Sequence, residues 1–256
     1  MSTIDNKLSE IYLVGAGPGD PELLTLKAKS ILEKSPLVIY DALVNPEILN
    51  FCDKNAELIK VGKRQGAHSY SQEQIAKLLI QKSYEFSLIT RLKGGDPCTF
   101  GRGAEEVLDL LPYPIRIRII PGITTATACA AYANLPLTHR VWSSSVSFIT
   151  GTEAEGKSVS HLKWANIIAG SDTVVIYMAL YNLPWIINKF IEVGKDKETP
   201  IMMIQWCSLP KQKTLTGTIG TILGQLRNSS FGPPSIAVIG DIVEVASILS
   251  TYKARN

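Results

Sequence analysis

Short apolar runs alternate with longer amphipathic segments along most of this 256-residue chain. The runs are rich in β-branched and other strand-forming residues, which predicts strands. The first set of predicted strands covers residues 11–15, 37–40, 58–61, 86–92 and 116–120. The second set covers residues 146–150, 173–177 and 201–206, the neighbourhood of Leu215, and residues 235–240. Strands that alternate with helices in this way are typical of α/β proteins.

Two of the predicted helices have clear N-terminal signals. Asp20 is placed to cap a helix whose first turn contains Pro21, a residue that the first helical position favours. Apolar residues then recur at helical spacing as far as Leu32, which predicts one continuous helix. Ser71 and Gln74 have the spacing of a capping box, so a second helix is expected to begin there.

The order of these elements divides the chain into two blocks. A helix at 101–111 and an alanine-rich helix after Gly122 complete the first block. A proline-containing segment at 135–138 follows, and the alternation then starts again. We therefore predict two α/β domains, at residues 11–138 and 141–246.

The composition is that of a folded, soluble protein. Hydrophobic residues make up 45% of the chain and charged residues 19%, which excludes the composition of disordered proteins. No apolar run approaches the roughly 20 residues of a membrane span, and the N-terminal sequence has no basic segment followed by an apolar one. These features predict a cytoplasmic protein with no membrane partner.

The cysteines and the net charge argue against two classes of function. The four cysteines, at positions 52, 98, 129 and 207, lie far apart without a CxxC pair, so we expect reduced thiols and no metal site. The net charge is only +3, from 26 basic and 23 acidic residues, which is too small to indicate a nucleic-acid partner. The positions of the basic residues are therefore more informative than their number.

The first candidate site is a glycine loop, VGAGPGDP at residues 14–21, at the end of the first predicted strand. Glycine lets a ligand approach the backbone closely. The glycine spacing differs from the dinucleotide fingerprint, and no Gly-Lys-Ser/Thr follows as it does in a P-loop. The acid at Asp20 would also repel a phosphate. A tight turn without a ligand is the structural alternative.

A second glycine loop follows the strand predicted at 86–92, within the sequence RLKGGDPCTFGRG at 91–103. Two loops of glycines, an acid and a proline after two strands are less expected by chance than one. Asp20 and Asp96 offer hydrogen-bond acceptors, which suits a ligand with hydroxyl or amino groups and no phosphate. The structural alternative is a turn in which Asp96 bonds its own backbone.

Charged residues follow other predicted strands as well. Asp41 comes after the strand at 37–40, and Lys63 and Arg64 come after the strand at 58–61, where ligands bind in open α/β sheets. Further basic residues near the loops complete a locally basic site, namely Arg91, Lys93, Arg102, His139 and Arg140. A polyanionic small substrate or RNA would fit such a site. The alternative for each residue is a surface charge or an ion pair between loops.

Six motifs occur along the chain in a characteristic order: VGAGPGDPELLT (14–25), VGKR (61–64), RLKGGDP (91–97), FGRG (100–103), PGIT (121–124) and PLTHR (136–140). With them the chain resembles the uroporphyrinogen-III C-methyltransferases, which are tetrapyrrole methyltransferases dependent on S-adenosylmethionine. The resemblance runs from about residue 11 to residue 245.

The resemblance implies two α/β domains with the active site in the cleft between them, and a homodimer. It implies methylation of uroporphyrinogen III at two ring carbons, which gives precorrin-2 by way of precorrin-1 for sirohaem or cobalamin synthesis. S-adenosylmethionine would be the methyl donor and S-adenosylhomocysteine the product, without a metal.

The resemblance also assigns roles to residues. Asp41 matches the proposed proton acceptor of the family, and Lys63 matches its proposed proton donor. The positions that match the donor-binding residues are Pro18, Gly94, Gly95, Asp96, Thr99, Thr124, Thr125, Met178 and Cys207. The basic residues expected to bind substrate carboxylates are Arg64, Arg91, Lys93, Arg102 and Arg140.

Some positions depart from the family pattern. Ala42 stands where an arginine is usual, Thr152 where a histidine is usual, and Cys207 where a glycine is common. Val141 and Trp142 replace the commoner Asp-Tyr after the PLTHR motif. The departures bear on substrate contacts more than on the donor site, where Cys207 would act through its backbone.

Three other functions stay open. Within the same fold class, the chain could methylate a later corrinoid precursor. A ribose methyltransferase of RNA has a related fold, although the nearly balanced charge counts against it. A non-catalytic ligand-binding protein is favoured only by the departures at Ala42 and Thr152.

Overall fold

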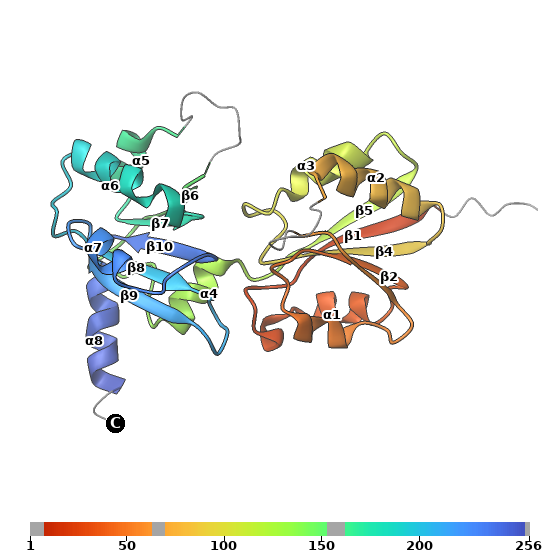
Figure 1. The fold of residues 1–256 in the computed structure, drawn as a ribbon, viewed down its shortest axis with the longest axis horizontal. Helices are drawn as coiled ribbons and strands as arrows, with labels where there is room; N and C mark the ends of the chain where they lie inside the picture. The colour runs from red at the N-terminus through yellow and green to blue at the C-terminus, as the bar shows by residue number, and fades with distance from the viewer. Residues whose placement is uncertain (1–7, 63–69, 153–161, 254–256) are drawn as a thin grey trace, which may run out of the picture. The chain divides into compact units, whose positions relative to one another are not determined.

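The computed structural model of the protein describes residues 8–62, 70–152 and 162–253. The chain divides into two compact units, Met1–Thr124 and Thr125–Asn256. Each unit contains a five-stranded sheet with helices packed on it (Figure 1). The predicted α/β fold is therefore confirmed.

The sheet of the first unit is parallel throughout, with the strand order β3-β2-β4-β1-β5. Its strands are β1 (Ser9–Gly15), β2 (Leu37–Tyr40), β3 (Glu57–Lys60), β4 (Leu88–Lys93) and β5 (Ile115–Ile120). The strands predicted for this part of the chain are confirmed, with small differences at their ends.

Helices cover both faces of this sheet. They are α1 (Leu26–Leu32), the short 3-10 helix η2 (Pro46–Phe51), α2 (Gln72–Ser83) and α3 (Gly103–Leu110). Because side chains alternate along a strand, Leu13 of β1 packs with the apolar residues of α2 and α3, whereas Val14 packs with those of α1. Figure 1 shows α1 on one face of the sheet and α2 and α3 on the other.

The first predicted helix is divided into two. Asp20 caps a 3-10 turn, η1 (Pro21–Leu23), because its Oδ1 accepts a hydrogen bond from the backbone N–H of Glu22 at 2.9 Å. Thr25 has an extended backbone and caps α1 separately. The predicted cap at Asp20 is confirmed, and the single continuous helix is wrong because a second capping residue interrupts it.

The capping box at the start of α2 is confirmed in both directions. The Ser71 hydroxyl accepts a hydrogen bond from the backbone N–H of Gln74 at 3.2 Å, and Gln74 Oε1 accepts one from the backbone N–H of Ser71 at 2.7 Å. Both bonds satisfy N–H groups that a helix start leaves without helical partners. The sequence signal therefore fixes where α2 begins.

Strands β1 and β4 are neighbours in the sheet, but their connections leave toward opposite faces. The chain after β1 leads to α1, and the chain after β4 leads to α3 on the other face (Figure 1). Open parallel sheets bind ligands beyond the carboxyl ends of strands where connections diverge in this way. The two glycine loops of the sequence follow β1 and β4.

The second unit contains a mixed sheet with the strand order β6-β7-β10-β8-β9. Its strands are β6 (Val146–Thr150), β7 (Thr173–Tyr177), β8 (Pro200–Gln205), β9 (Lys213–Thr218) and β10 (Ser235–Ile239). Only the β6–β7 pair among these strands is parallel. The strands that the sequence predicts here are confirmed.

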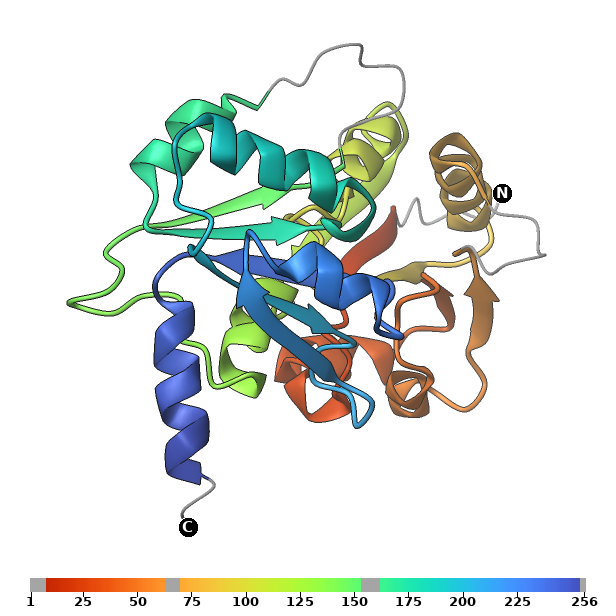
Figure 2. The same cartoon turned by 60° about the vertical axis from the view of Figure 1, so that its left-hand side comes forward.

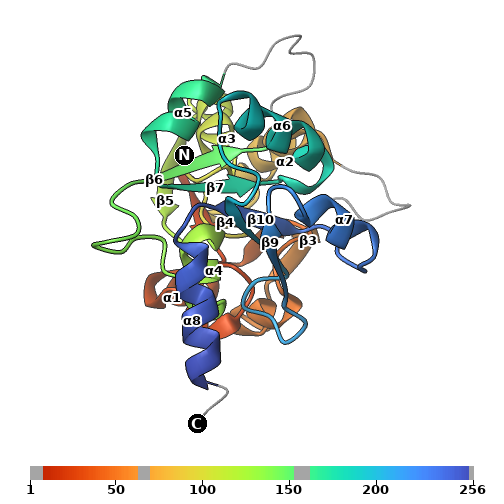
Figure 3. The same cartoon turned by 90° about the vertical axis from the view of Figure 1, so that its left-hand side faces the viewer.

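The helices of the second unit lie on both sides of its sheet. They are α4 (Thr125–Tyr132), α5 (Trp164–Gly170), η3 (Leu180–Asn182), α6 (Leu183–Glu192), α7 (Ile222–Arg227) and α8 (Val243–Lys253). Figure 2 and Figure 3 show α5 and α6 on one side of the sheet and α4 and α8 on the other. Ile186 and Phe190 of α6 pack with Ile176 and Met203 of the sheet in the main apolar core.

Helix α4 belongs to the second unit by its contacts. The backbone N–H of Ala126 donates to Tyr177 Oη at 3.0 Å, and the Tyr132 carbonyl accepts from Gln212 Nε2 at 3.1 Å. The two units therefore divide before α4, whereas the sequence places the change of domain near residue 138. The proline-containing segment is a loop inside the second unit.

Candidate functional site

The two glycine loops form one paired structure at the carboxyl ends of β1 and β4. The backbone N–H of Gly17 donates to the Gly95 carbonyl at 3.1 Å, and the N–H of Gly95 donates to the Gly17 carbonyl at 2.7 Å. The N–H of Ala16 donates to the Lys93 carbonyl at 2.7 Å. The two loops that the sequence singles out separately are therefore one site.

Close backbone approach explains the glycines in these loops. A Cβ atom on Gly15 would lie 2.5 Å from the backbone nitrogen of Gly122 and 2.7 Å from the Gly95 carbonyl oxygen. Gly17 and Gly95 have φ angles of +75° and +67°, which glycine adopts without steric cost. A third loop, after β5, thus packs against the other two. Only glycine fits where these three strand ends meet.

Asp96 ties the second and third loops together. Its Oδ1 accepts hydrogen bonds from the backbone N–H of Cys98 at 2.8 Å and from the Thr99 hydroxyl at 3.2 Å. Its Oδ2 accepts one from the backbone N–H of Gly122 at 3.0 Å. The turn that the sequence left open as a structural alternative is therefore present. Each carboxylate oxygen has two lone pairs, so Oδ2 keeps one acceptor site for a ligand.

The loop after β1 is held by its own polar contacts. Asn45 Nδ2 donates to the Gly19 carbonyl at 2.8 Å, which joins this loop to the segment after β2. Pro18 is half-buried between the two glycines that flank it. These loops carry acids and, from Gly94 to Thr99, no basic side chain. Such a set of groups suits a cationic ligand better than a phosphate.

Four charged residues form a cluster beneath the end of β4, and we call Asp41, Arg91, Lys93 and Glu106 the ion cluster. Arg91 Nη2 lies 2.5 Å from Asp41 Oδ1 and 3.2 Å from Glu106 Oε1. Lys93 Nζ bonds Glu106 Oε1 and lies 3.9 Å from Asp41 Oδ2. Two cations and two carboxylates balance within the cluster.

Arg91 uses every N–H group of its guanidinium inside the protein. Nε and Nη2 donate to the two oxygens of Glu106, both at 3.2 Å, and Nη2 also donates to Asp41. Nη1 donates to the carbonyls of Ile39 at 3.4 Å and Leu92 at 3.2 Å. A guanidinium has five N–H groups, so none is left for a further acceptor.

Two of the residues predicted to contact substrate belong to the ion cluster. The side chain of Arg91 is 1% exposed and that of Lys93 is 4% exposed, and both are paired with Glu106. Burial lowers the pKa of Lys93, and the neighbouring positive charge of Arg91 lowers it further. Both side chains therefore already have a carboxylate partner from helix α3 and expose little surface to a substrate carboxylate.

Asp41 is the member of the ion cluster that a ligand can reach, since its side chain is 28% exposed. Its backbone N–H donates to the Leu92 carbonyl at 3.2 Å, which holds it beside β4. The backbone of Ala42 packs against Gly62, and a Cβ atom on Gly62 would collide with Ala42. Lys63 and Arg64, which follow Gly62, lie outside the described residues.

The other two predicted substrate-binding arginines are exposed. The backbone of Arg102 is in the left-handed region, with φ of +56°. Nε and Nη2 of its guanidinium donate hydrogen bonds to the carboxylate of Glu105. That carboxylate raises the pKa of Arg102. Arg140 lies on an exposed loop, next to His139, whose backbone pairs with Ser143. Both arginines can therefore meet a ligand from solution.

The predicted donor-binding residues of the second unit lie at one edge of its sheet. Met178 follows β7, has φ of +54° and is 49% exposed. The Thr152 hydroxyl donates a hydrogen bond to the Met178 carbonyl at 3.3 Å. Thr152, which departs from the family pattern, therefore stabilises the segment that follows β7. Thr125 opens α4, and the bond between Ala126 and Tyr177 Oη brings that helix to the end of β7.

Cys207 follows β8 and lies between two residues with strained backbone conformations. Cys207 is buried, and its neighbours Trp206 and Ser208 have φ angles of +52° and +63°. Lys211 Nζ lies 3.4 Å from the centre of the Trp206 ring. Such strain is concentrated at functional sites in proteins, and it persists only where the surrounding structure enforces it. The sequence did not predict the left-handed backbone at Trp206 and Ser208, because neither residue type favours such φ angles.

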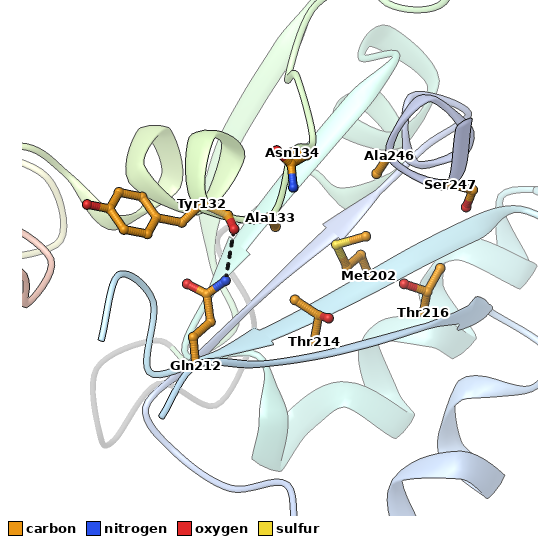
Figure 4. A pocket seen from close by; sticks show the side chains of 9 residues that line it. All are labelled: Tyr132, Ala133, Asn134, Met202, Gln212, Thr214, Thr216, Ala246 and Ser247. Atoms are coloured by element: carbon orange, nitrogen blue, oxygen red, sulfur yellow. Dashed lines mark hydrogen bonds between the residues drawn. The ribbon is translucent and has the colours of Figure 1, made fainter. Parts of the chain in front are cut away.

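A pocket of about 300 Å³ lies elsewhere in the second unit (Figure 4). It is lined by Tyr132, Ala133, Asn134, Met202, Gln212, Thr214, Thr216, Ala246 and Ser247. These residues come from α4, β8, β9 and α8, together with the segments that follow α4 and precede β9. None of the predicted site residues that the structure describes lines this pocket.

The described part of the chain comprises residues 8–62, 70–152 and 162–253. They contain no cluster of three or more His, Cys, Asp or Glu residues that could hold a metal ion. They also contain no helix with the length and apolar character that a membrane crossing requires.

Comparison with known proteins identifies the family. The family model described as tetrapyrrole (corrin/porphyrin) methylases matches residues 10–223. The chain is a tetrapyrrole methylase. This match spans both units and includes all the glycine loops and the ion cluster.

Individual relatives agree with this family. The chain is 56% identical to the uroporphyrinogen-III C-methyltransferase of Cyanidium caldarium over 247 residues, which cover 96% of this methylase and 98% of the relative. It is 41% identical to the siroheme synthase of Azotobacter vinelandii, of which it spans only 53%. The structure of the uroporphyrin-III C-methyltransferase of Thermus thermophilus, complexed with S-adenyl homocysteine, superposes with a TM-score of 0.79 at 33% identity, covering 93% of this chain and all of that one.

One residue of the ion cluster was not identified from the sequence at all. Glu106 is fully buried and contacts both cations of the ion cluster. Its sequence context is a pair of acids in the first turn of a predicted helix, which is typical of exposed helix starts. A buried charge at this position is visible only once α3 is packed on the sheet.

Proposed function

We propose that this tetrapyrrole methylase transfers methyl groups from S-adenosylmethionine to two ring carbons of uroporphyrinogen III, giving precorrin-2 by way of precorrin-1. The observation that carries the proposal is the 56% identity, along nearly the whole chain, to a relative with that activity in its name. The product would enter sirohaem or cobalamin synthesis, and S-adenosylhomocysteine would be the second product.

The chemistry of the glycine loops fits the methyl donor. S-adenosylmethionine supplies a sulfonium methyl group, which is an activated electrophile, together with an amino acid and a ribose. The loops at the ends of β1, β4 and β5 offer backbone groups and acids, and residues 94–99 include no basic side chain, which suits such a ligand. The residues proposed to hold it are Pro18, Gly94, Gly95, Asp96, Thr99, Thr124, Thr125, Met178 and Cys207.

The residues proposed for the substrate are fewer than the sequence suggested. Arg102 and Arg140 are exposed and can bind the carboxylates of uroporphyrinogen III. Arg64 remains a proposed substrate-binding residue on the basis of the sequence alone. Arginine binds carboxylates through two parallel hydrogen bonds, which fixes their orientation. Arg91 and Lys93 are proposed to act indirectly, by contacting Asp41 within the ion cluster.

Asp41 is proposed as the general base. Attack of a pyrrole carbon on the methyl group leaves a cationic tetrapyrrole, which must lose a proton. The exposed face of the Asp41 carboxylate can accept that proton, while Arg91 keeps its Oδ1 in place at 2.5 Å. Lys63 stays the proposed proton donor from the family resemblance.

Asp41→Asn tests this role, since it keeps the shape of the side chain and removes its basicity. We expect kcat to fall by about 100-fold or more, with the KM for S-adenosylmethionine changed by less than about two-fold. Product formation is followed by absorbance. Glu47→Gln, an exposed acid on η2, is the matched control and should retain full activity. Turnover of Asp41→Asn within a few-fold of the parent would contradict the assignment.

The activity itself is tested with the purified protein. It is incubated without oxygen with S-adenosylmethionine and enzymatically made uroporphyrinogen III, and the products are identified by absorbance and by mass spectrometry. A product with two added methyl groups supports the proposal. Binding of the donor without this product would favour a later corrinoid precursor, which is tested as a second acceptor. No binding of the donor would overturn the proposal.

We also propose that the enzyme is a cytoplasmic homodimer that acts on a small molecule, without a nucleic-acid or membrane partner. The family resemblance supports the dimer, and the net charge of +3 supports the absence of nucleic acid. Light scattering of the purified protein measures the oligomeric state, and a monomer at working concentration would contradict the dimer.

A further inference from the structure

Glu106 is a buried carboxylate that the proposed chemistry does not use. It lies in the first turn of α3, with no exposed surface. Removing a carboxylate from water is unfavourable unless opposite charges and hydrogen bonds replace its hydration. At Glu106 that replacement is complete, because Arg91, Lys93 and Gln72 all donate to it.

The contacts of Glu106 lead to Asp41. Arg91 donates to Glu106 through Nε and Nη2, and the same Nη2 donates to Asp41 Oδ1 at 2.5 Å. Lys93 Nζ bonds Glu106 and lies 3.9 Å from the other oxygen of Asp41. Glu106 therefore holds the charged groups of Arg91 and Lys93 in position, and these groups lie next to the two oxygens of Asp41.

The balance of positive and negative charges in the ion cluster affects the position of the Asp41 carboxylate. The two cations face two carboxylates, of which Glu106 is fully buried and Asp41 is 28% exposed. Without Glu106, two buried cations would compete for the single carboxylate of Asp41. Both oxygens of Asp41 would then be drawn into the protein, away from the side that a ligand can reach.

We propose that Glu106 is a positioning residue for Asp41, acting through Arg91 and Lys93. By holding both cations, Glu106 leaves the Asp41 carboxylate anchored by one oxygen and open to a substrate proton on its exposed face. The inference rests on the proposed role of Asp41 as the base. It assigns no contact between Glu106 and substrate.

A double-mutant cycle tests this inference. The full-length enzyme and its variants Glu106→Gln, Asp41→Asn and the double variant are assayed in single turnovers with enzyme in excess, so that slow variants stay measurable. We expect Glu106→Gln to lower the methylation rate by about 10-fold or more, and to leave the S-adenosylmethionine concentration that gives half of the maximal rate within about two-fold of that of the parent. In the Asp41→Asn background the same change should alter the rate by less than about two-fold.

The outcomes separate this inference from the proposed function. Rate losses that multiply in the double variant would show that Glu106 acts independently of Asp41, which overturns the inference alone. An unchanged rate in Glu106→Gln also overturns it. A rate for Asp41→Asn near that of the parent overturns the proposed base, and with it the inference that rests on that base.

Two further variants keep the test decisive. Asp109→Asn removes an exposed acid from the same helix and should leave the rate unchanged. If thermal melting shows that Glu106→Gln does not fold, the cycle is repeated with Glu106→Asp, which keeps the charge and shortens the side chain. That variant is expected to lose part of the rate, again only when Asp41 is present. A loss that persists without Asp41 would contradict the positioning role.

Discussion

Two arginines near the second glycine loop have opposite surroundings. Arg91 is 1% exposed and donates to carboxylates and carbonyls inside the protein, whereas Arg102 is 57% exposed and pairs with Glu105. From the sequence both were expected to bind the substrate, because both lie near the end of one strand. Burial distinguishes them, since a buried guanidinium must have all of its donors paired.

Arg91→Lys tests this distinction. A lysine keeps the charge, but its three N–H groups cannot reach the acceptors that a planar guanidinium serves. We expect the free energy of unfolding to fall by about 2–4 kcal/mol, measured by urea denaturation. Arg102→Lys is the matched control and should change it by less than about 0.5 kcal/mol. Similar losses in both variants would contradict the ion cluster.

At the scale of elements, three loops at strand ends are packed together by backbone contacts. The loops after β1, β4 and β5 meet at Gly15, Gly95 and Gly122. Parallel strands bring their carboxyl ends to the same edge of the sheet, and the order β4-β1-β5 makes these three strands neighbours. Glycines from three separate segments of the sequence therefore come together at one edge of the sheet.

Gly15→Ala tests this packing. The added Cβ would lie 2.5 Å from the Gly122 nitrogen, so the loops must move apart. We expect a stability loss of about 1–3 kcal/mol, together with weaker binding of S-adenosylmethionine in calorimetry. Gly224→Ala in α7, where no described atom beyond the adjacent residues and the backbone of the same helix lies within 4 Å of the new Cβ, should instead gain about 0.5–1 kcal/mol. Donor binding unchanged in Gly15→Ala would argue against the proposed donor site.

For the whole molecule, the ion cluster makes stability depend on pH. Burial and Arg91 lower the pKa of Lys93 from its ordinary value of 10.5 in the folded protein, and the unfolded chain keeps that ordinary value. Between the two values the unfolded chain binds more protons. The contribution of Lys93 to the stability of the folded protein therefore rises with pH across this window.

Comparison with Lys93→Met isolates this contribution, because methionine does not titrate. Urea denaturation at several pH values should show the parent gaining stability relative to Lys93→Met as the pH approaches the ordinary lysine value. Lys77→Met, at an exposed lysine whose pKa is raised by Glu73, should show no such gain. A difference between the parent and Lys93→Met that stays flat or falls with pH would contradict the buried state of Lys93.

Much of the fold was predictable because its signals are local. The strands, the capping box at Ser71 and the glycine loops depend on residue type and spacing over short stretches, and the structure confirms them. The break before α1 was missed because Thr25 provides a cap within an otherwise helical pattern. The grouping of α4 with the second unit was also missed, because it depends on contacts with Tyr177 and Gln212, far along the chain.

The sequence by itself determined the α/β class, the glycine loops and the resemblance to tetrapyrrole methyltransferases, since motifs and periodicity are properties of the chain. Only the tertiary structure decided which of the charges near these loops are buried and which are exposed. Arg91 and Lys93 point to the sheet face that α3 covers, and there Glu106 pairs with them. Which helix covers a face depends on the topology of the whole sheet, so no local pattern records that these cations are buried and that Asp41 is reachable.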